Sequence, residues 1–233
     1  EQAVDRGCNE LVKIEVPESW KNLEIPQEAA DENLPEYMRT IGNAMNHLRG
    51  DSLPVSAFKD SPDGTMPVGT SKYDKRGVAV DVPVWNPDKC IQCNQCSLVC
   101  PHAAIRPFLL TEEESKKAPA GFKQMDAKGK GMEGLKFAIQ VDPLDCLGCG
   151  VCVNACPAKE KALEMSSLES QMPEAENWEY AMTLSTKKNP ADKFSVKGSQ
   201  FEQPLLEFSG ACAGCGEAAY MKLATQLFGD RMI

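Results

Sequence analysis

The sequence predicts an α+β fold organised around two copies of one cysteine run. Each run reads C-x2-C-x2-C-x3-C-P, and the second copy begins at Cys146, 56 residues after the first begins at Cys90. Segments with the apolar pattern of strands flank the runs, at 78–84, 135–141 and 162–165. Such a repeat predicts two similar half-domains related by a pseudo-two-fold axis, in a core spanning roughly 84–165.

The spacing of the cysteines is typical of [4Fe–4S] ligation. Two intervening residues let a loop curl around a cubane with backbone N–H groups directed at sulfur, and the fourth cysteine of each run ligates the other cluster. Gly148 and Gly150 suit such a loop because glycine adopts positive φ. We assign Cys90, Cys93, Cys96 and Cys156 to cluster one, and Cys146, Cys149, Cys152 and Cys100 to cluster two. The prediction is a ferredoxin-like two-[4Fe–4S] domain.

Disulfides and zinc are the alternatives for so many cysteines. A disulfide scaffold fits poorly with 233 residues and an odd total of eleven cysteines. Zinc sites favour two pairs of ligands separated by a longer gap, whereas each run places four cysteines within eleven residues. A zinc-bound interaction module would be colourless, while two clusters would make the protein brown, with iron and acid-labile sulfide in equal amounts.

Composition and charge restrict the partners that the chain can bind and the cellular compartment in which it is expected. The formal net charge of −9 is unsuited to a nucleic-acid surface, and no apolar run approaches the length of a membrane span. No signal peptide is visible, and the chain runs from Glu1 to Ile233 without a starting Met, so we expect a piece of a longer protein. Thiolate ligation of oxygen-sensitive clusters predicts a reducing cytoplasm.

The residues before the first run predict a small α/β domain. A helix is expected over 35–49, because Met38, Ile41, Met45 and Leu48 recur at steps of three and four. A short strand is expected near Leu11, Ile14 and Val16. The charged run 71–76 is typical of a solvated loop, and alternating valines over 78–84 predict a strand with one buried face.

The segment 101–145, between the runs, is expected to be a long insertion. It contains an exposed helical turn at 112–117 and a flexible stretch at 121–134, where three glycines mimic a dinucleotide fingerprint without the strand that should precede it. Asp142 and Asp145 are expected to shape the loop that enters the second cluster, rather than to catalyse a reaction. A short helix is predicted over 174–184.

The last part of the chain carries half of a further cluster site. A polar linker at 185–200 leads to Cys212 and Cys215, which form one C-x2-C pair. The other uncommitted cysteine is Cys8, which we interpret as a free thiol. Because two thiolates do not hold a cubane firmly, we expect no third cluster in this chain and a loosely held segment over about 200–233.

Three segments, in this order, resemble one family. Gly-Thr-Ser-Lys-Tyr-Asp-Lys-Arg-Gly at 69–77, the paired runs with their insertion, and the stretch 210–217 are similar to the central-to-C-terminal part of pyruvate:ferredoxin (flavodoxin) oxidoreductases. The resemblance implies a small Glu-Lys-Arg-type domain over 1–83, a two-cluster domain over 84–184, and a linker with the truncated start of a thiamine diphosphate domain over 185–233. Asp74 stands where the signature has Glu.

The resemblance also implies roles. The segment would relay single electrons from a thiamine-bound intermediate through two [4Fe–4S] clusters to ferredoxin or flavodoxin. Cys212 and Cys215 would be two ligands of a third cluster, and Glu217 would lie at the thiamine diphosphate site, although Ala218-Ala219 replace the usual Thr-Pro. The whole enzyme, a homodimer using Mg²⁺ and coenzyme A, would convert pyruvate to acetyl-CoA. We identify no catalytic residue in this segment, which alone should not catalyse the reaction. A stand-alone two-cluster ferredoxin-type carrier is the alternative, but it would not need 185–233.

Overall fold

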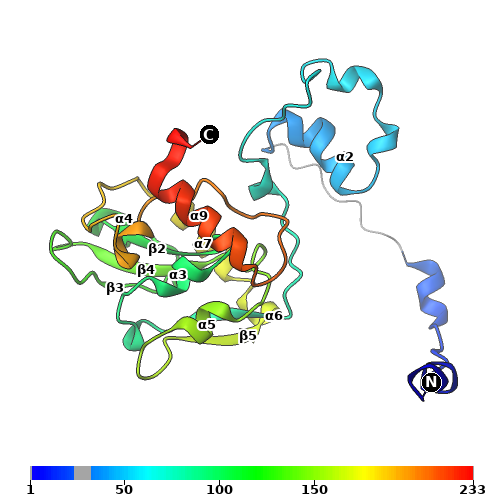
Figure 1. Cartoon of the computed structure of the whole chain (residues 1–233), viewed down its shortest axis with the longest axis horizontal. Helices are drawn as coiled ribbons and strands as arrows, with labels where there is room; N and C mark the ends of the chain where they lie inside the picture. The colour runs from blue at the N-terminus through cyan, green and yellow to red at the C-terminus, as the bar shows by residue number, and fades with distance from the viewer. Residues whose placement is uncertain (1, 24–32, 233) are drawn as a thin grey trace. The chain divides into compact units, whose positions relative to one another are not determined.

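The computed structural model describes residues 2–23 and 33–232 of the chain, which form two compact units, Glu1–Lys59 and Asp60–Ile233 (Figure 1). Both cysteine runs and the terminal C-x2-C pair lie in the second unit. Over the described ranges, no helix is long and apolar enough to cross a lipid bilayer.

The first unit consists, in its described residues, of short helical segments without a strand. They are α1 (Gln2–Asn9), η1 (Glu18–Asn22), η2 (Met38–Gly42), α2 (Asn43–Asn46), η3 (Gly50–Ser52) and η4 (Val55–Phe58). The strand expected near Leu11 does not form: Leu11 is 82% exposed and no described strand of this unit is there to pair with it. The predicted helix over 35–49 already ends at Asn46, because Leu48 adopts φ 57° and is exposed.

The second unit contains two antiparallel sheets. In one, β1 (Asp81–Trp85) pairs with β5 (Leu163–Ser167). In the other, β4 (Lys136–Val141) lies between β2 (Ile105–Leu110) and β3 (Met125–Asp126). Apolar side chains of both sheets form one core, to which Trp85, Ile105, Phe137 and Leu163 contribute.

The two sheets express the sequence repeat. Each copy runs strand, cysteine loop, short helix, strand: β1, α3 (Gln95–Val99) and β2 in the first, and β4, α5 (Val151–Ala155) and β5 in the second. The first strand of each copy pairs with the last strand of the other copy. This exchange is the pseudo-two-fold arrangement that the repeat predicts, and it carries the end of each run across to the other half.

Two strand predictions need correction. The insertion expected over 101–145 contains β2, so the segment that interrupts the repeat is 111–135. Pro107 obscures this strand, yet it is tolerated because β2 is an edge strand. The strand predicted over 78–84 begins only at Asp81. Val78 and Val80 are 61% and 83% exposed, because the paired ladder with β5 does not reach them.

The helices around the sheets include several that the sequence predicts. The expected turn at 112–117 is α4 (Glu112–Lys117), begun by a capping box of Thr111 and Glu114. The expected helix near 174–184 is α7 (Glu174–Met182), which packs on β4 and buries Trp178. The remaining elements of this part are η5 (Thr70–Tyr73), η6 (Pro87–Lys89) and α6 (Leu168–Gln171).

The terminal segment is packed, contrary to the expectation that 200–233 is loosely held. The elements from 196 onward, which we call the terminal segment, are α8 (Val196–Ser199), α9 (Gly216–Phe228) and η7 (Gly229–Arg231). α9 lies against α3 and α8, and it buries Ala218, Lys222 and Gln226, which share one helical face (Figure 1). The segment carries its own anchors, so it does not depend on a third cluster for its place.

Candidate metal centres

Four thiols line one pocket beside the first cysteine loop. They belong to Cys90, Cys93, Cys96 and Cys156, the set assigned to cluster one. The aromatic rings of Trp85 and Phe137 form part of the same wall. The donor set and the apolar wall fit a thiolate-ligated cluster; the ligation itself stays a prediction.

A second pocket gathers the other four thiols of the runs. It is lined by Cys100, Cys146, Cys149 and Cys152, together with Pro83 and His102. Cys100 reaches this pocket from the first run, and Cys156 reaches the first pocket from the second run. This exchange follows from the strand pairing. The strand after α3 pairs with the first strand of the second copy, and the strand after α5 pairs with the first strand of the first copy.

Backbone N–H groups point at sulfur in both loops. Gln92 N donates to Cys90 Sγ, and Gly148 N donates to Cys146 Sγ, each at 3.4 Å. Gln92 and Gly148 occupy equivalent positions of the repeat, and both have positive φ, 57° and 66°. The loops therefore have the inward N–H donors that a cubane's sulfur ligands require.

An unpaired donor also faces the first pocket. Trp85 Nε1 is buried, and it has no oxygen or nitrogen partner among the described residues. It lies close enough to the Cys90 thiol to lower the pKa of that thiol, although burial raises the pKa more. A donor without a conventional acceptor in this wall fits a site whose acceptor is cluster-bound sulfur.

The Cys146 and Cys152 thiols of the second pocket are protonated at neutral pH when no iron is bound. Burial, and then the neighbouring cysteines, raise the pKa of Cys152 to about 12, and burial raises that of Cys146 to the same value. Iron must therefore displace protons as it binds. Over 2–23 and 33–232, no three Cys, His, Asp or Glu residues approach closely enough to hold a single ion. A cubane differs because its thiolates bind separate irons.

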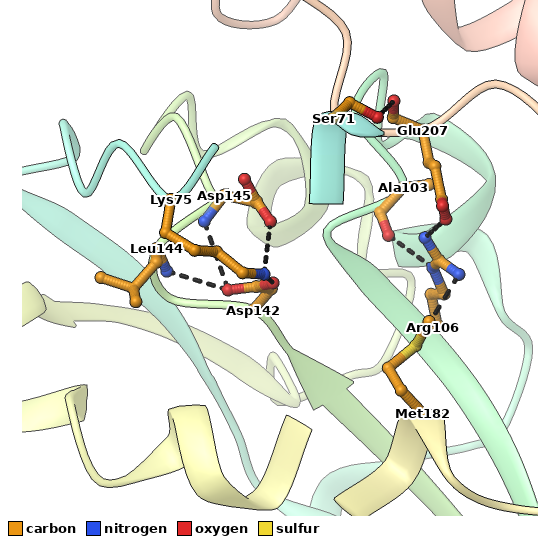
Figure 2. A network of polar contacts seen from close by, with 9 residues as sticks. All are labelled: Ser71, Lys75, Ala103, Arg106, Asp142, Leu144, Asp145, Met182 and Glu207. Atoms are coloured by element: carbon orange, nitrogen blue, oxygen red, sulfur yellow. Dashed lines mark hydrogen bonds and ion pairs between the residues drawn. The ribbon is translucent and has the colours of Figure 1, made fainter. Parts of the chain in front are cut away.

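An ion-pair cluster of Lys75, Asp142 and Asp145, which we call the clasp, holds the turn that enters the second cysteine loop. Lys75 Nζ donates to Asp142 Oδ2 at 2.5 Å and to Asp145 Oδ2 at 2.7 Å, while both carboxylates are buried (Figure 2). Gly77 N donates to Leu144 O at 2.8 Å. Residues 69–77, which we call the signature loop, therefore bind the turn that leads into Cys146. The prediction that 71–76 is a solvated loop is therefore wrong for Lys75. The structural role predicted for Asp142 and Asp145 agrees with these contacts.

The signature loop also contacts the segment that leads to Cys212. Ser71 Oγ donates to Glu207 O at 3.4 Å, and the Glu207 carboxylate accepts from Arg106 of β2 (Figure 2). The Arg106 guanidinium is buried and lies over the rings of Trp178 and Phe208. One loop thus ties together the second cysteine loop, β2 and the terminal segment.

The terminal pair lies beside the second pocket. A Cβ atom placed on Gly214, between Cys212 and Cys215, would be 3.5 Å from Cys149 Cβ. His102, which lines the second pocket, contacts Ser209 O through Nδ1 at 3.2 Å. Burial lowers the pKa of His102, and hydrogen bonds to the backbone of Cys212 and Ser209 partly oppose this. The two thiols are therefore close to cluster two's proposed ligands.

Glu217 and Cys8 line neither pocket. Glu217 is exposed in the first turn of α9 and accepts from Tyr220 Oη at 3.4 Å. Cys8 is an exposed free thiol on α1, in the other unit. Sequence reasoning missed the parts played by Gln92, Lys75 and His102. Aligning the two copies of the repeat would have indicated Gln92, because it stands where the second copy has glycine.

Two family models match the chain. EKR, described as a domain of unknown function, matches residues 24–79, which include the signature loop. A 4Fe-4S dicluster domain matches residues 89–159, which include both cysteine runs. The chain therefore contains a 4Fe-4S dicluster domain, built of helices and antiparallel sheets.

Curated relatives match nearly the whole chain. Pyruvate-flavodoxin oxidoreductase of Enterobacter agglomerans is 58% identical over 99% of this chain and 19% of the relative. Pyruvate:ferredoxin oxidoreductase of Moorella thermoacetica is 55% identical over 99% of this chain and 20% of the relative. Pyruvate dehydrogenase [NADP(+)] of Euglena gracilis is 47% identical over 95% of this chain and 12% of the relative. The chain thus spans about a fifth of the length of the first two proteins.

Proposed function

Because 99% of the chain aligns with one segment of the pyruvate-flavodoxin and pyruvate:ferredoxin oxidoreductases, we propose that it is the electron-transfer segment of such an enzyme. It would hold two [4Fe–4S] clusters, each of which would accept and release one electron at a time. The main support for this proposal is the pair of pockets, each lined by four cysteine thiols. In each pocket three thiols come from one run and the fourth comes from the other run.

The chain would supply ligands, donors and a fixed spacing. Cys90, Cys93, Cys96 and Cys156 would hold cluster one, and Cys100, Cys146, Cys149 and Cys152 would hold cluster two. Trp85 Nε1 and the inward N–H groups of Gln92 and Gly148 would donate to sulfur and so stabilise the added electron. The packed sheets between the two halves would keep the two sites at a constant separation.

The order of the sites would follow from the terminal pair. Cys212 and Cys215 would be half of a third [4Fe–4S] site in the whole protein. They lie beside Cys149, so electrons would pass first to cluster two and then to cluster one. Ferredoxin or flavodoxin would then accept them at the cluster-one side.

The whole protein would add what this segment lacks. We propose the division 1–83 for the Glu-Lys-Arg-type domain, 84–184 for the two-cluster domain with its insertion, and 185–233 for the linker and the start of a thiamine diphosphate domain. Glu217 would lie near the thiamine diphosphate and Mg²⁺. The complete enzyme would be a cytoplasmic homodimer that converts pyruvate and coenzyme A to acetyl-CoA.

Cysteine variants test the crossed ligand sets. The reconstituted chain should carry about eight irons, with equal sulfide, and the variant Cys90→Ala/Cys93→Ala should keep about four. In that background, Cys100→Ala should abolish the remaining cluster, whereas Cys156→Ala should leave it. The reverse result would mean that each run holds its own cluster, and a chain that binds zinc but no sulfide would overturn the proposal altogether.

Electron transfer is tested with the same chain. The reconstituted protein, reduced by a strong reductant, should pass electrons to ferredoxin or flavodoxin, and the iron-free chain should not. It should not reduce a dye with pyruvate, even when thiamine diphosphate is added. Pyruvate-dependent reduction by this segment alone would contradict the division of roles.

A further inference from the structure

Lys222 is a fully buried cation beside the short helix of the first cysteine run. Its side chain projects from α9 and is 1% exposed. Nζ donates to Ser97 O, in the short helix α3 that separates Cys96 from Cys100, and to Gln200 Oε1 at 3.4 Å. Ser97 O also accepts from Cys100 N at 3.2 Å. The ammonium group thus contacts the chain between a proposed ligand of cluster one and a proposed ligand of cluster two.

The immediate surroundings of Lys222 are neutral. Ser97 Oγ and Gln226 bind the amide of Gln200 and fix it beside the ammonium group, but they bring no charge. No carboxylate within the described ranges lies within 4.0 Å of Nζ. Arg106 is the neighbouring cation, and its charge is balanced by Glu207. Lys222 is therefore a buried charge without a counter-ion in the protein.

A buried ammonium without a counter-ion is unfavourable, because its desolvation is not compensated. The groups near Lys222 that can become anionic are the sulfurs of Cys100 and Cys96, which would lose their protons when iron binds. A [4Fe–4S] cluster with four thiolate ligands carries net negative charge in both redox states, and reduction adds one more negative charge. Bound clusters would therefore supply the missing counter-charge.

We propose that Lys222 is the shared counter-ion of the two clusters and that it raises both reduction potentials. The inference rests on the proposed two-cluster function. A nearby positive charge stabilises the reduced, more negative state of each cluster. Since Lys222 belongs to the terminal segment, that segment would set the potentials of the neighbouring dicluster domain.

Redox titration of the full reconstituted chain, followed by electron paramagnetic resonance, tests this proposal. In Lys222→Met, the ratio of reduced to oxidised cluster at a fixed potential should fall about tenfold at both sites, or about 59 mV for a one-electron step. Lys222→Gln should shift as far, because it keeps a donor for Ser97 O but loses the charge. Lys116→Met, which removes an exposed lysine of α4, should leave both potentials unchanged.

Stability of the iron-free chain separates charge from packing. Without clusters, Lys222→Met should not lower the unfolding temperature, because it removes an uncompensated buried charge. If Lys222 only caps α3, Met should destabilise the iron-free and loaded chains alike, Gln should restore stability, and neither should move the potentials; that result would overturn the proposal. Wild-type iron content is the separate check: if it falls short of two clusters, the proposed function fails, whereas full loading with unchanged potentials refutes the Lys222 inference alone.

Discussion

The two cysteine loops have the same backbone course but obtain it by different chemistry. Two positions of each loop have positive φ. One is the second residue after the first cysteine of the run, and the other directly follows the second cysteine. In the second loop they are Gly148 and Gly150, for which this conformation costs little. In the first they are Gln92, for which it is strained, and Asn94, which tolerates it better than other residues that carry a Cβ atom. The comparison shows that the motif fixes a loop shape rather than a residue type.

Each loop is supported by a different part of the chain. Gln92 binds the insertion, donating through Nε2 to Asp126 O and accepting from Lys128 N, and Asn94 Nδ2 donates to Lys197 O. The second loop makes no such side-chain bonds at Gly148 and Gly150. Its support is the signature loop, through Lys75. The first site therefore depends on the insertion and terminal segment, and the second on the signature loop.

The turns that enter the loops differ in charge. Asn86 accepts from Asp88 N at 2.9 Å, and Asp142, its equivalent, accepts from Leu144 N at 3.0 Å. The geometry is shared, but Asp142 adds a buried charge, and Asp145 adds a second where the first turn has Lys89. Only the second turn therefore needs a cation, which Lys75 supplies.

Removing Lys75 should give the largest effect. Lys75→Met leaves two buried carboxylates without their cation, and should lower the free energy of unfolding by about 2–4 kcal/mol. Cluster two should be lost before cluster one, as measured by iron content and paramagnetic resonance during anaerobic denaturation. The first cysteine loop, which has no contact with Lys75, should keep its iron longer.

Two controls test the charge explanation for Lys75. Arg76→Met removes an adjacent, largely exposed cation that pairs with Asp74, and should cost less than about 1 kcal/mol. Asp142→Asn gives the second turn the residue of the first turn, so it should partly rescue Lys75→Met. Equal losses for Lys75→Met and Arg76→Met would contradict the clasp.

The next largest effect should come from Gly148→Ala. A Cβ atom there would lie 2.8 Å from Asp81 O and 3.2 Å from Ala79 Cβ, and the residue would keep φ 66°. Because Asp81 O is backbone of β1, it cannot move aside cheaply, so we expect a loss of about 2–3 kcal/mol and poor loading of cluster two. Gly150→Ala is the matched control: it has φ 70° but no atom within 4 Å, and should cost only about 1 kcal/mol.

A smaller, pH-dependent effect should come from Glu114 of α4. Its carboxylate accepts hydrogen bonds from Ser185 and Lys187, at the start of the linker 185–200. Burial raises the pKa of Glu114, but hydrogen bonds from Lys187, Thr111 and Ser185 outweigh it and lower the pKa to about 2. Its contribution is therefore full above the ordinary value near 4.5 and is lost as pH falls toward 2. Glu114→Gln should cost about 1–2 kcal/mol at pH 7.

The measurement for Glu114 is denaturant unfolding of the iron-free chain from pH 7 to pH 3, with Glu112→Gln as the control. Glu112 belongs to the same helix but forms an exposed pair with Lys116. The difference between wild type and Glu114→Gln should shrink as pH falls, whereas the small effect of Glu112→Gln should hardly change. A constant difference for Glu114→Gln would mean that its ion pair is not responsible.

Much of the fold could be predicted because local pattern and tertiary structure agree. The repeat predicts the two halves, and Thr111 with Glu114 marks the start of α4. β2 could not be read from local pattern, because Pro107 breaks the strand signal and its fit depends on an edge position known only from the sheet. The two partners of Lys75 could not be predicted either, because a run of charged residues does not indicate which carboxylates some seventy residues away it will contact.

Exchanging Asn94 and its equivalent Gly150 should give the smallest effect and the sharpest test of the shared loop shape. Asn94→Gly relieves only the small strain of asparagine at φ 61° and loses the bond to Lys197 O, so it should cost no more than about 1 kcal/mol. Gly150→Asn should also be tolerated, because asparagine adopts this conformation readily and the site is open. Asn94→Ala loses the same bond and adds strain, because alanine tolerates positive φ less well than asparagine, so it should cost about 2 kcal/mol. Iron content should stay at two clusters in both exchanges; a loss with Asn94→Gly as large as with Asn94→Ala would mean that the first loop depends on the Lys197 contact and not on its backbone conformation.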